Sequence, residues 1–320
     1  MRRGVKISLI LAAILTVAGG AVCLAGLGIM GFDLSGVAAP AQTRNYEVVQ
    51  EVTSISVEVD TADVTLLPAT DGVCRIVCKE RGRLQHTMSL QEGRLEIRVA
   101  DTRKWYDHIG IFTGETSVTL YLPEGEYGEL SVKTDTGDVA VPAGMSFTRV
   151  SVETDTGDVQ LQSKVAQGLT VGTHTGDVTV VGASFGQLSV TTTTGDVSAQ
   201  SVAVAEGVVL NTDTGDVTLT DLSCNQMSLT TDTGDVTLSR TLVTEQMAVK
   251  TDTGDVTLTD CDAAGLQIKT NTGDVEGSLR TDKIFRATSD TGDISVPDTV
   301  AGGICAVETD TGDITLRIGQ

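Results

Sequence analysis

The sequence has few aromatic, histidine and basic residues, and each shortage excludes a class of protein. Phe, Trp and Tyr make up 3% of the 320 residues, so we expect a thin core of many small layers. Only His86, His108 and His174 are present, which leaves little material for acid–base catalysis. Lys and Arg number 22 against 43 Asp and Glu, a net charge of −21. That balance argues against binding nucleic acid or an anionic membrane surface, because phosphates require clustered basic side chains.

The six cysteines do not form a disulfide framework. Cys74 and Cys78 lie four residues apart on one expected strand, a separation of about 13 Å. Two Cα atoms more than about 7 Å apart cannot be bridged. Cys224 and Cys261 fall in repeats that are not adjacent, and Cys305 takes an apolar position. We therefore expect most cysteines to be small buried side chains.

The N-terminus reads as a membrane anchor. Residues 7–32 carry no charge, and about 20 apolar residues suffice to cross a bilayer core. A secretory signal has a shorter apolar region, of about 7–15 residues. The preceding Arg2, Arg3 and Lys6 favour a cytoplasmic N-terminus and an exported remainder. We predict an uncleaved signal-anchor over residues 1–32 and a linker over residues 33–45, with a cleaved signal as the alternative.

The tripeptide Thr-Gly-Asp occurs ten times, at spacings of 19 or 20 residues. A fixed period of this length is typical of a solenoid. A degenerate eleventh copy at residues 60–64 has Ala62 in the glycine position. The ten glycines are Gly137, Gly157, Gly176, Gly195, Gly215, Gly234, Gly254, Gly273, Gly292 and Gly312.

Apolar residues alternate with polar ones on both sides of each glycine. With glycine as position zero, positions −7, −5, +2 and +4 are mostly apolar, which predicts one strand entering the motif and another leaving it. Glycine at the bend permits a positive φ or a close backbone approach. We predict an all-β fold: a parallel β-solenoid of about ten 19–20-residue coils over residues 129–320.

Residues 46–128 differ from the regular array and are predicted to form an N-terminal antiparallel β cap. It would contain the degenerate first coil and a β-meander over residues 73–100, inserted between that coil and the array. No comparable cap follows the last copy. We therefore expect an open edge at the C-terminal coil, which favours end-to-end self-association.

Stacked coils place equivalent side chains above one another, so the Asp at position +1 forms a column. Neighbouring charges about 4.8 Å apart repel by roughly 0.9 kcal/mol in water. A stable column therefore requires a favourable interaction that offsets this repulsion. Either the side chains bond to backbone N–H groups in the turns, or calcium binds the carboxylates. The candidate metal ligands are Asp138, Asp158, Asp177, Asp196, Asp216, Asp235, Asp255, Asp274, Asp293 and Asp313.

Two known repeat types offer comparisons for these columns. The motif resembles the calcium-binding nonapeptide repeats of secreted toxins but departs from their Gly-Gly-x-Gly-x-Asp pattern and their 18-residue coil. The Thr columns at −3 and −1 resemble those of β-helical ice-binding proteins. Parity places both columns on the buried side, which argues against an ice-binding face.

One aromatic cluster, residues 104–112, contains the single Trp. It either plugs the cap or forms a recognition loop, because Trp and Tyr make good interface anchors. The candidate partner-binding residues are Trp105, Tyr106, His108 and Phe112. The sequence shows no nucleophile–base pair, zinc spacing or phosphate loop, so an enzyme is not expected.

The Thr-Asp-Thr-Gly-Asp-Val repeats after a single anchor resemble the bacterial β-strand-repeat "putative adhesin" domain of unknown function, over roughly residues 45–320. The resemblance implies a cell-envelope protein, in some members linked to envelope stress, and brings no catalytic residue. We predict a single-pass protein of the bacterial cell membrane whose extracytoplasmic solenoid is a scaffold or interaction surface, with a cell-wall or protein partner and no cofactor. The alternatives are a calcium-stabilised adhesion module and a carbohydrate-active β-helix enzyme.

Overall fold

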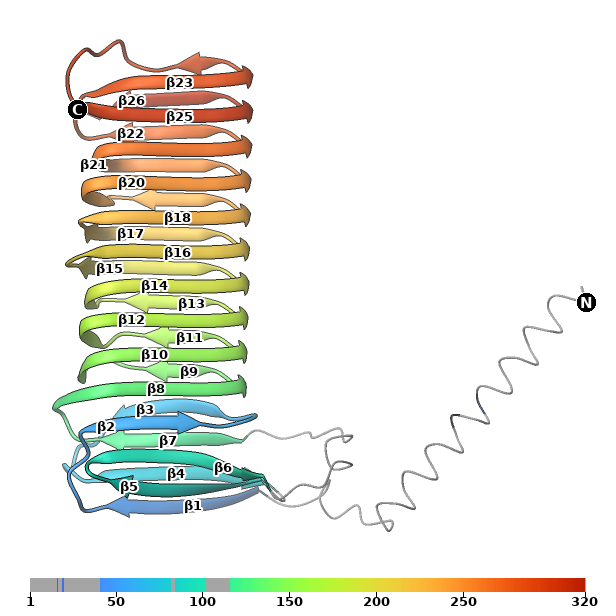
Figure 1. Ribbon diagram of the computed structural model, residues 1–320, viewed down its shortest axis with the longest axis vertical. Helices are drawn as coiled ribbons and strands as arrows, with labels where there is room; N and C mark the ends of the chain where they lie inside the picture. Colours follow the sequence, from blue (N-terminus) through green and yellow to red (C-terminus); the bar gives the residue numbers. More distant parts are fainter. Residues whose placement is uncertain (1–15, 17–18, 20–40, 82–83, 102–115, 320) are drawn as a thin grey trace, which may run out of the picture.

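The strands wind into a rod of stacked coils (Figure 1). The computed structural model describes residues 16, 19, 41–81, 84–101 and 116–319. Hydrogen bonds connect the 26 strands of the described residues into one continuous network. No helix in the described ranges is long and apolar enough to cross a membrane, and the predicted anchor lies outside them apart from residues 16 and 19.

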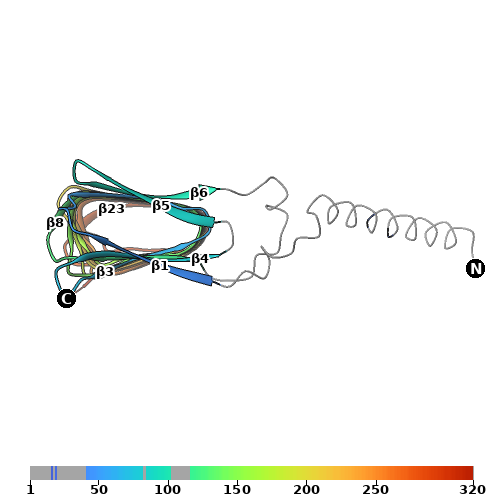
Figure 2. The ribbon, with the colours of Figure 1, turned by 90° about the horizontal axis from the view of Figure 1, so that it is seen from below.

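Each coil contributes one strand to each of two facing sheets, which enclose a flat core when the rod is viewed end-on (Figure 2). The incoming sheet holds the strands that run into the Thr-Gly-Asp turns. Its order along the rod is β5 (Leu84–Gln91), β6 (Arg94–Asp101), β2 (Ser54–Glu58), β8 (Glu126–Thr136), β10 (Ser146–Thr156), β12 (Lys164–Thr175), β14 (Ser184–Thr194), β16 (Gly207–Thr214), β18 (Gln226–Thr233), β20 (Leu242–Thr253), the second half of β21 (Val256–Thr272), β25 (Gly303–Thr311) and β23 (Lys283–Thr291).

The outgoing sheet holds the strands that leave the turns. Its order is β1 (Ala41–Val48), β4 (Cys74–Arg81), β7 (Ser117–Leu122), β3 (Asp63–Pro68), β9 (Val139–Val141), β11 (Val159–Leu161), β13 (Val178–Val181), β15 (Val197–Val204), β17 (Val217–Cys224), β19 (Val236–Ser239), the first half of β21, β22 (Val275–Leu279), β26 (Ile314–Ile318) and β24 (Ile294–Ser295).

The core consists of the apolar positions that the repeat predicted. Positions −7, −5 and +2 are buried in nine of the ten coils. These residues are mostly Val, Leu and Ile, whose branched side chains suit a pleated, half-buried strand. Ten coils at about 4.8 Å give a rod section of about 48 Å. The parallel β-solenoid of about ten coils is confirmed.

The cap at the N-terminal end is antiparallel, but its pairing differs from the predicted meander. β4 pairs antiparallel with β1 and β7, and β5 pairs antiparallel with β6; no ladder joins β4 to β5 among the described residues. β4 and β6 each bury an alternating apolar row, so each needs a facing layer across the core. In the predicted meander both strands would lie in the same sheet, and neither could supply the facing layer for the other.

The degenerate coil also lies elsewhere than expected. Its strands β2 and β3 pair directly with β8 and β9 of the regular array. The cap strands therefore lie beyond the degenerate coil in space, although they follow it in the sequence.

The last coil of the sequence is not the last coil of the rod. β25 lies between β21 and β23, and β26 lies between β22 and β24 (Figure 1). The expected open edge at the C-terminal coil is therefore wrong, and the terminal layer is the coil of residues 283–295. That coil carries Ala287 and Ser289 where the C-terminal coil carries Val307 and Thr309. At these two positions the coil with the larger side chains takes the place that is covered on both sides, although Phe285 of the terminal coil is larger than its partner Cys305.

Candidate functional site

The column of Thr-Gly-Asp turns is the most regular feature of the rod, and its glycines are required by geometry. All ten have φ between +151° and +155°. A Cβ built on Gly215 lies 2.6 Å from the carbonyl carbon of Gly195 in the preceding coil, and still closer to its oxygen. No side chain fits there, which explains the invariant residue. Ala62 is not among the positive-φ residues.

The Asp at position +1 has a direct structural partner. Nine of the ten carboxylates accept a backbone N–H from the equivalent Asp in the next coil, as from Asp235 N–H to Asp216 Oδ1 at 2.8 Å; the exception is Asp293, in the terminal coil. The same bond recurs along the column. A hydrogen bond to a charged group contributes about 1.5–3 kcal/mol, which exceeds the repulsion of about 0.9 kcal/mol between neighbours. The turn chemistry expected as one of two explanations is therefore present.

The buried Thr column completes the turn. The hydroxyl of the Thr at position −3 donates to the glycine carbonyl of the preceding coil, as from Thr231 to Gly215 at 3.3 Å. The glycine N–H in turn donates to the Thr carbonyl of the following coil, as from Gly215 to Thr233 at 2.9 Å. Every inner turn is thus tied to both of its neighbours.

The Thr at position −1 does not point inward as predicted. The −3 threonines are buried, whereas all ten −1 threonines are exposed. In the ladder between β8 and β10, Thr134 pairs with Thr154 and Thr136 with Thr156, while the intervening Asp residues are not paired. Both Asp135 and Thr136 donate their N–H groups to the Asp60 carbonyl, so the alternation breaks at this point. The parity argument against an ice-binding face is therefore wrong for the −1 column and correct for the buried −3 column.

Exposed carboxylates at position −2 form a second acidic column. Partial burial and the neighbouring Asp60 and Asp155 carboxylates raise the pKa of Asp135. In the described residues no group of three or more His, Cys, Asp or Glu side chains is arranged to hold a metal ion. Calcium binding by the +1 column stays a prediction.

A different column occupies the bend after the outgoing strands. Ser201, Asp221, Arg240 and Asp260, all six residues after a motif glycine, have φ between 48° and 56°. Non-glycine residues rarely adopt this conformation. The repeat pattern did not reveal this column, because its residue types vary from coil to coil.

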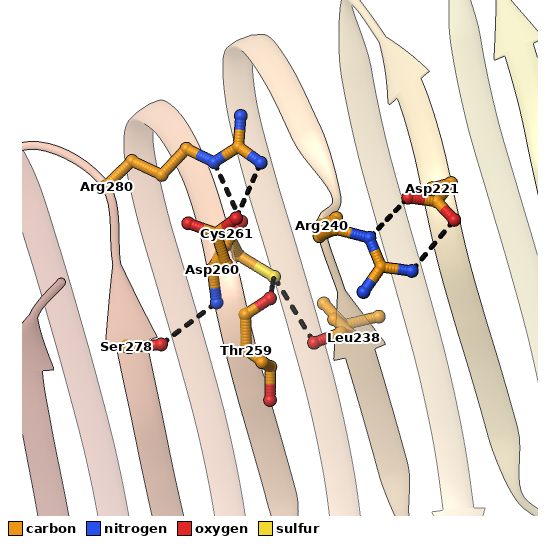
Figure 3. A network of polar contacts seen from close by, with 8 residues as sticks. All are labelled: Asp221, Leu238, Arg240, Thr259, Asp260, Cys261, Ser278 and Arg280. Atoms are coloured by element: carbon orange, nitrogen blue, oxygen red, sulfur yellow. Dashed lines mark hydrogen bonds and ion pairs between the residues drawn. The ribbon is translucent and has the colours of Figure 1, made fainter.

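Charges alternate along this bend (Figure 3). Arg240 donates two hydrogen bonds to Asp221, at 2.5 and 2.8 Å, and Arg280 donates to Asp260 at 2.7 Å. These guanidinium groups lower the pKa of both carboxyls through hydrogen bonding. The pairs join successive coils and are exposed, so each contributes little to stability.

Beside this bend lies an open groove of about 1050 Å³, lined by residues of several successive coils that include Cys224, Val243, Asp262 and Lys283. Lys283 is buried, and its Nζ donates to Asp262 at 2.6 Å and to Thr281 Oγ1 at 2.5 Å. Through these two hydrogen bonds the ammonium group ties the terminal coil to the neighbouring coils.

A buried titratable cluster lies in the cap. Glu80 accepts from Arg44 Nε at 2.9 Å and contacts His86 Nδ1 at 3.3 Å. Among the residues that the structure describes, His86 Nε2 has no hydrogen-bond partner. Burial lowers the pKa of His86, and Glu80 opposes that shift. Sequence reasoning did not single out this cluster.

The remaining sequence predictions concern the cysteines and the aromatic cluster. The five cysteines in the described ranges are free and buried, as expected. Burial raises the pKa of Cys78, Cys224 and Cys305 to about 12. Trp105, Tyr106, His108 and Phe112 lie outside the described residues, so their role as a recognition loop stays a prediction.

The fold and its repeated turns agree with a family match that covers most of the chain. The model of the Toastrack DUF4097 family matches residues 52–207 and 185–320. The chain therefore belongs to this family of β-repeat domains of unknown function, as the resemblance predicted. No curated protein matches the sequence.

Solved structures with a related fold are of bacterial proteins. A putative adhesin from Bacteroides fragilis is 15% identical with a TM-score of 0.44, covering 87% of this chain and 97% of its own. A putative adhesin from Parabacteroides distasonis is 9% identical with a TM-score of 0.48, covering 87% and 98%. One from Parabacteroides merdae is 12% identical with a TM-score of 0.32, covering 88% and 96%. Similarity this low carries no functional conclusion for this chain.

Proposed function

We propose that this protein is a non-enzymatic scaffold or interaction rod, held at the bacterial cell membrane by residues 7–32 with its solenoid outside the cytoplasm. The observation that carries the proposal is the rod itself. Every inner coil is bonded to the coils on both sides, and β1, where the described rod begins, lies at the opposite end from β23 (Figure 1). Such a rod holds its far end at a fixed distance from its point of attachment.

The distribution of acidic groups supports a structural rather than a catalytic role. Nine of the ten +1 carboxylates accept a backbone N–H of the next coil, and the charged pairs of the second bend join neighbouring coils. A carbohydrate-active enzyme would require carboxylates that converge on one position. We propose that the rod takes part in adhesion or in an envelope-stress response, without a cofactor and without nucleic acid. The term adhesin is taken from the names of the solved proteins described above.

Membrane topology gives the first test. Thr191 is exposed on an inner coil, so Thr191→Cys supplies a reactive thiol on the rod, with the unsubstituted chain as control. A membrane-impermeant maleimide should label this variant in intact spheroplasts, and the labelled protein should resist alkaline extraction from membranes. Labelling only after lysis, or release of the protein by alkali, would overturn the proposed location.

Calcium gives the test of the alternative adhesion module. Thermal unfolding in EDTA and across a calcium series, with magnesium and sodium controls, separates metal sites from an acidic surface. We expect the three salts to act alike by screening. A saturable rise in melting temperature with calcium alone would favour the calcium-stabilised module.

A further inference from the structure

The terminal coil leaves one strand edge of the rod unpaired. β23 pairs with β25 on one side, and β24 pairs with β26 on one side; in the part of the chain that the structure describes, no strand covers the other side of either. In the inner coils, the N–H groups of the motif glycine and of position +2 donate to the following coil. The equivalent groups of Gly292 and Ile294 have no following coil.

The last two layers of the rod, β25 and the edge strands β23 and β24 with the segment between them, are unusually apolar. Ile284, Ile294, Val300 and Ile304 are four of the six large hydrophobic side chains exposed in the described residues. Phe285, on the inner face of β23, is only partly buried, whereas its neighbour Cys305 in β25 is fully buried. Exposed apolar surface of this kind marks an interaction site more often than it marks an ordinary surface.

The charges on the outer face of β23 indicate what covers it. In the inner coils, outward charges of neighbouring strands pair, as Lys133 with Glu153 at 3.1 Å and Lys269 with Glu308 at 2.7 Å. Arg286 and Asp290 are exposed on the same face, and neither forms an ion pair with a described residue. An antiparallel pairing of β23 with a second β23, centred on Thr288, brings each Arg286 opposite the Asp290 of the other copy.

Other registers satisfy these charges less well. A pairing centred on Arg286 places two guanidinium groups opposite each other, and one centred on Asp290 places two carboxylates together. Like charges directly opposite each other destabilise a ladder. Of these three registers, only the one centred on Thr288 places opposite charges of the two copies against each other. An isologous two-fold interface requires this kind of self-complementarity.

We propose that the β23 edge pairs antiparallel with the β23 edge of a second copy, so that two rods join end to end. The pairing itself does not depend on where the protein resides. Its consequence rests on the proposed function: because β1, which follows the predicted anchor in the sequence, lies at the end opposite to β23, two membrane-anchored copies would meet at their outer ends and bridge two surfaces. The partner is thus a second copy of this chain.

Disulfide trapping tests the register directly. In a pairing centred on Thr288 with its backbone groups turned to β25, the two Thr288 residues form a non-hydrogen-bonded pair, with Cα atoms about 4.5 Å apart. That separation permits a disulfide. Under mild oxidation of the full chain in detergent, Thr288→Cys should give a disulfide-linked dimer. Thr191→Cys, at the same position relative to its motif on an inner coil, should give none. Equal yields, or no dimer from Thr288→Cys, would overturn the proposal.

Charge reversal supplies an independent check on the Thr288→Cys background. Arg286→Asp should lower the rate of cross-linking by about tenfold, because two opposite-charge pairs become two like-charge pairs. The double variant Arg286→Asp with Asp290→Arg should restore the rate. Both side chains are exposed, so the fold should persist, and circular dichroism checks this. A single reversal without effect, or a double variant that stays slow, would contradict the pairing.

Vesicles separate the pairing from its proposed role. Full-length protein in two differently labelled populations of uncharged phosphatidylcholine vesicles should cross-link between populations through Thr288→Cys. Cross-linking in detergent without bridging of vesicles would leave the pairing intact and refute bridging by anchored copies. Bridging without any Thr288→Cys cross-link would refute the β23 interface.

Discussion

The glycine at the centre of each turn offers the sharpest test of how the rod is held together. We predict that Gly215→Ala strongly destabilises the protein. The substitution adds a single methyl group in an inner coil, and the new Cβ would lie 2.6 Å from the Gly195 carbonyl carbon. A Cβ rarely approaches another heavy atom closer than 3.4 Å, so the two coils must move apart by roughly 1 Å.

The cost follows from the bonds across that gap. Four hydrogen bonds join the two turns: Gly195 N–H to Thr214, Val197 N–H to Asp216, Asp216 N–H to Asp196 and Thr212 Oγ1 to Gly195. At about 1 kcal/mol each, their loss costs about 4 kcal/mol. An alanine held at φ +152° adds about 1–3 kcal/mol of backbone strain. The total is about 5–7 kcal/mol, or a fall in melting temperature on the order of 10 °C.

Two other glycines provide matched controls. Gly172 has an ordinary φ and open space around it, so Gly172→Ala should change stability by less than about 0.5 kcal/mol. Gly182 has φ +61° and also has open space, so Gly182→Ala should show the conformational cost alone, about 1–2 kcal/mol. Comparison of the three variants separates strain from collision.

Thermal unfolding followed by circular dichroism measures the three variants, and amide exchange locates the damage. Repeat arrays can loosen locally, so Gly215→Ala should accelerate exchange at Gly195 and Val197 before the melt. If Gly215→Ala melts like Gly172→Ala, the reasoning about coil contact is refuted. If it melts like Gly182→Ala, the collision contributes nothing and strain alone selects glycine.

Three further predictions concern side chains. Asp216→Ala should cost about 1–3 kcal/mol because the Asp235 N–H loses its acceptor, whereas Asp216→Asn should be neutral or stabilising because it keeps an acceptor and removes a charge; urea unfolding compares the two, and an equal loss would contradict the ladder. The lowered pKa of His86 means that the unfolded chain takes up a proton first, so stability should fall as the pH drops below about 6.5; melting temperatures between about pH 7 and pH 5 should show this slope, and His86→Gln should flatten it. The buried cysteines should resist a thiol reagent in the native state and react after unfolding; in a Cys23→Ser background, rapid labelling of the native protein would contradict their burial.

The spacing of apolar residues was enough to predict the solenoid. A period near 19.4 residues with alternation on both sides of glycine leaves few alternatives, and Val132, Val152 and their equivalents are buried as expected. Because the repeats are so similar, the sequence pattern did not predict the order in which the last coils stack. β23 and β25 present the same motif at the same spacing, so either could stack on β21. The smaller Ala287 and Ser289 indicate that β23 takes the end, but Phe285, which is larger than its partner Cys305, indicates the opposite.

Local backbone geometry was the second feature that the sequence pattern did not predict. The exposed −1 threonines follow from successive N–H groups of Asp135 and Thr136 sharing one acceptor, which a strict period of two does not anticipate. The column of left-handed residues at Asp221, Arg240 and Asp260 has no common residue type. The Glu80–His86 contact depends on how the cap strands pair across the core, and pairing between strands is not contained in the pattern of each one.

The insertion of β25 between β21 and β23 reverses the order of the last two layers relative to the sequence. Residues 283–295 leave the ribosome before residues 303–318, yet in the finished rod they rest on the later segment. A premature stop after residue 302 would remove β25 and β26, which lie beneath the terminal coil. The terminal coil of residues 283–295 would remain but would lose the layer on which it rests. Gene duplications that lengthen this protein can therefore insert coils anywhere before β21, but should leave the closing pair together.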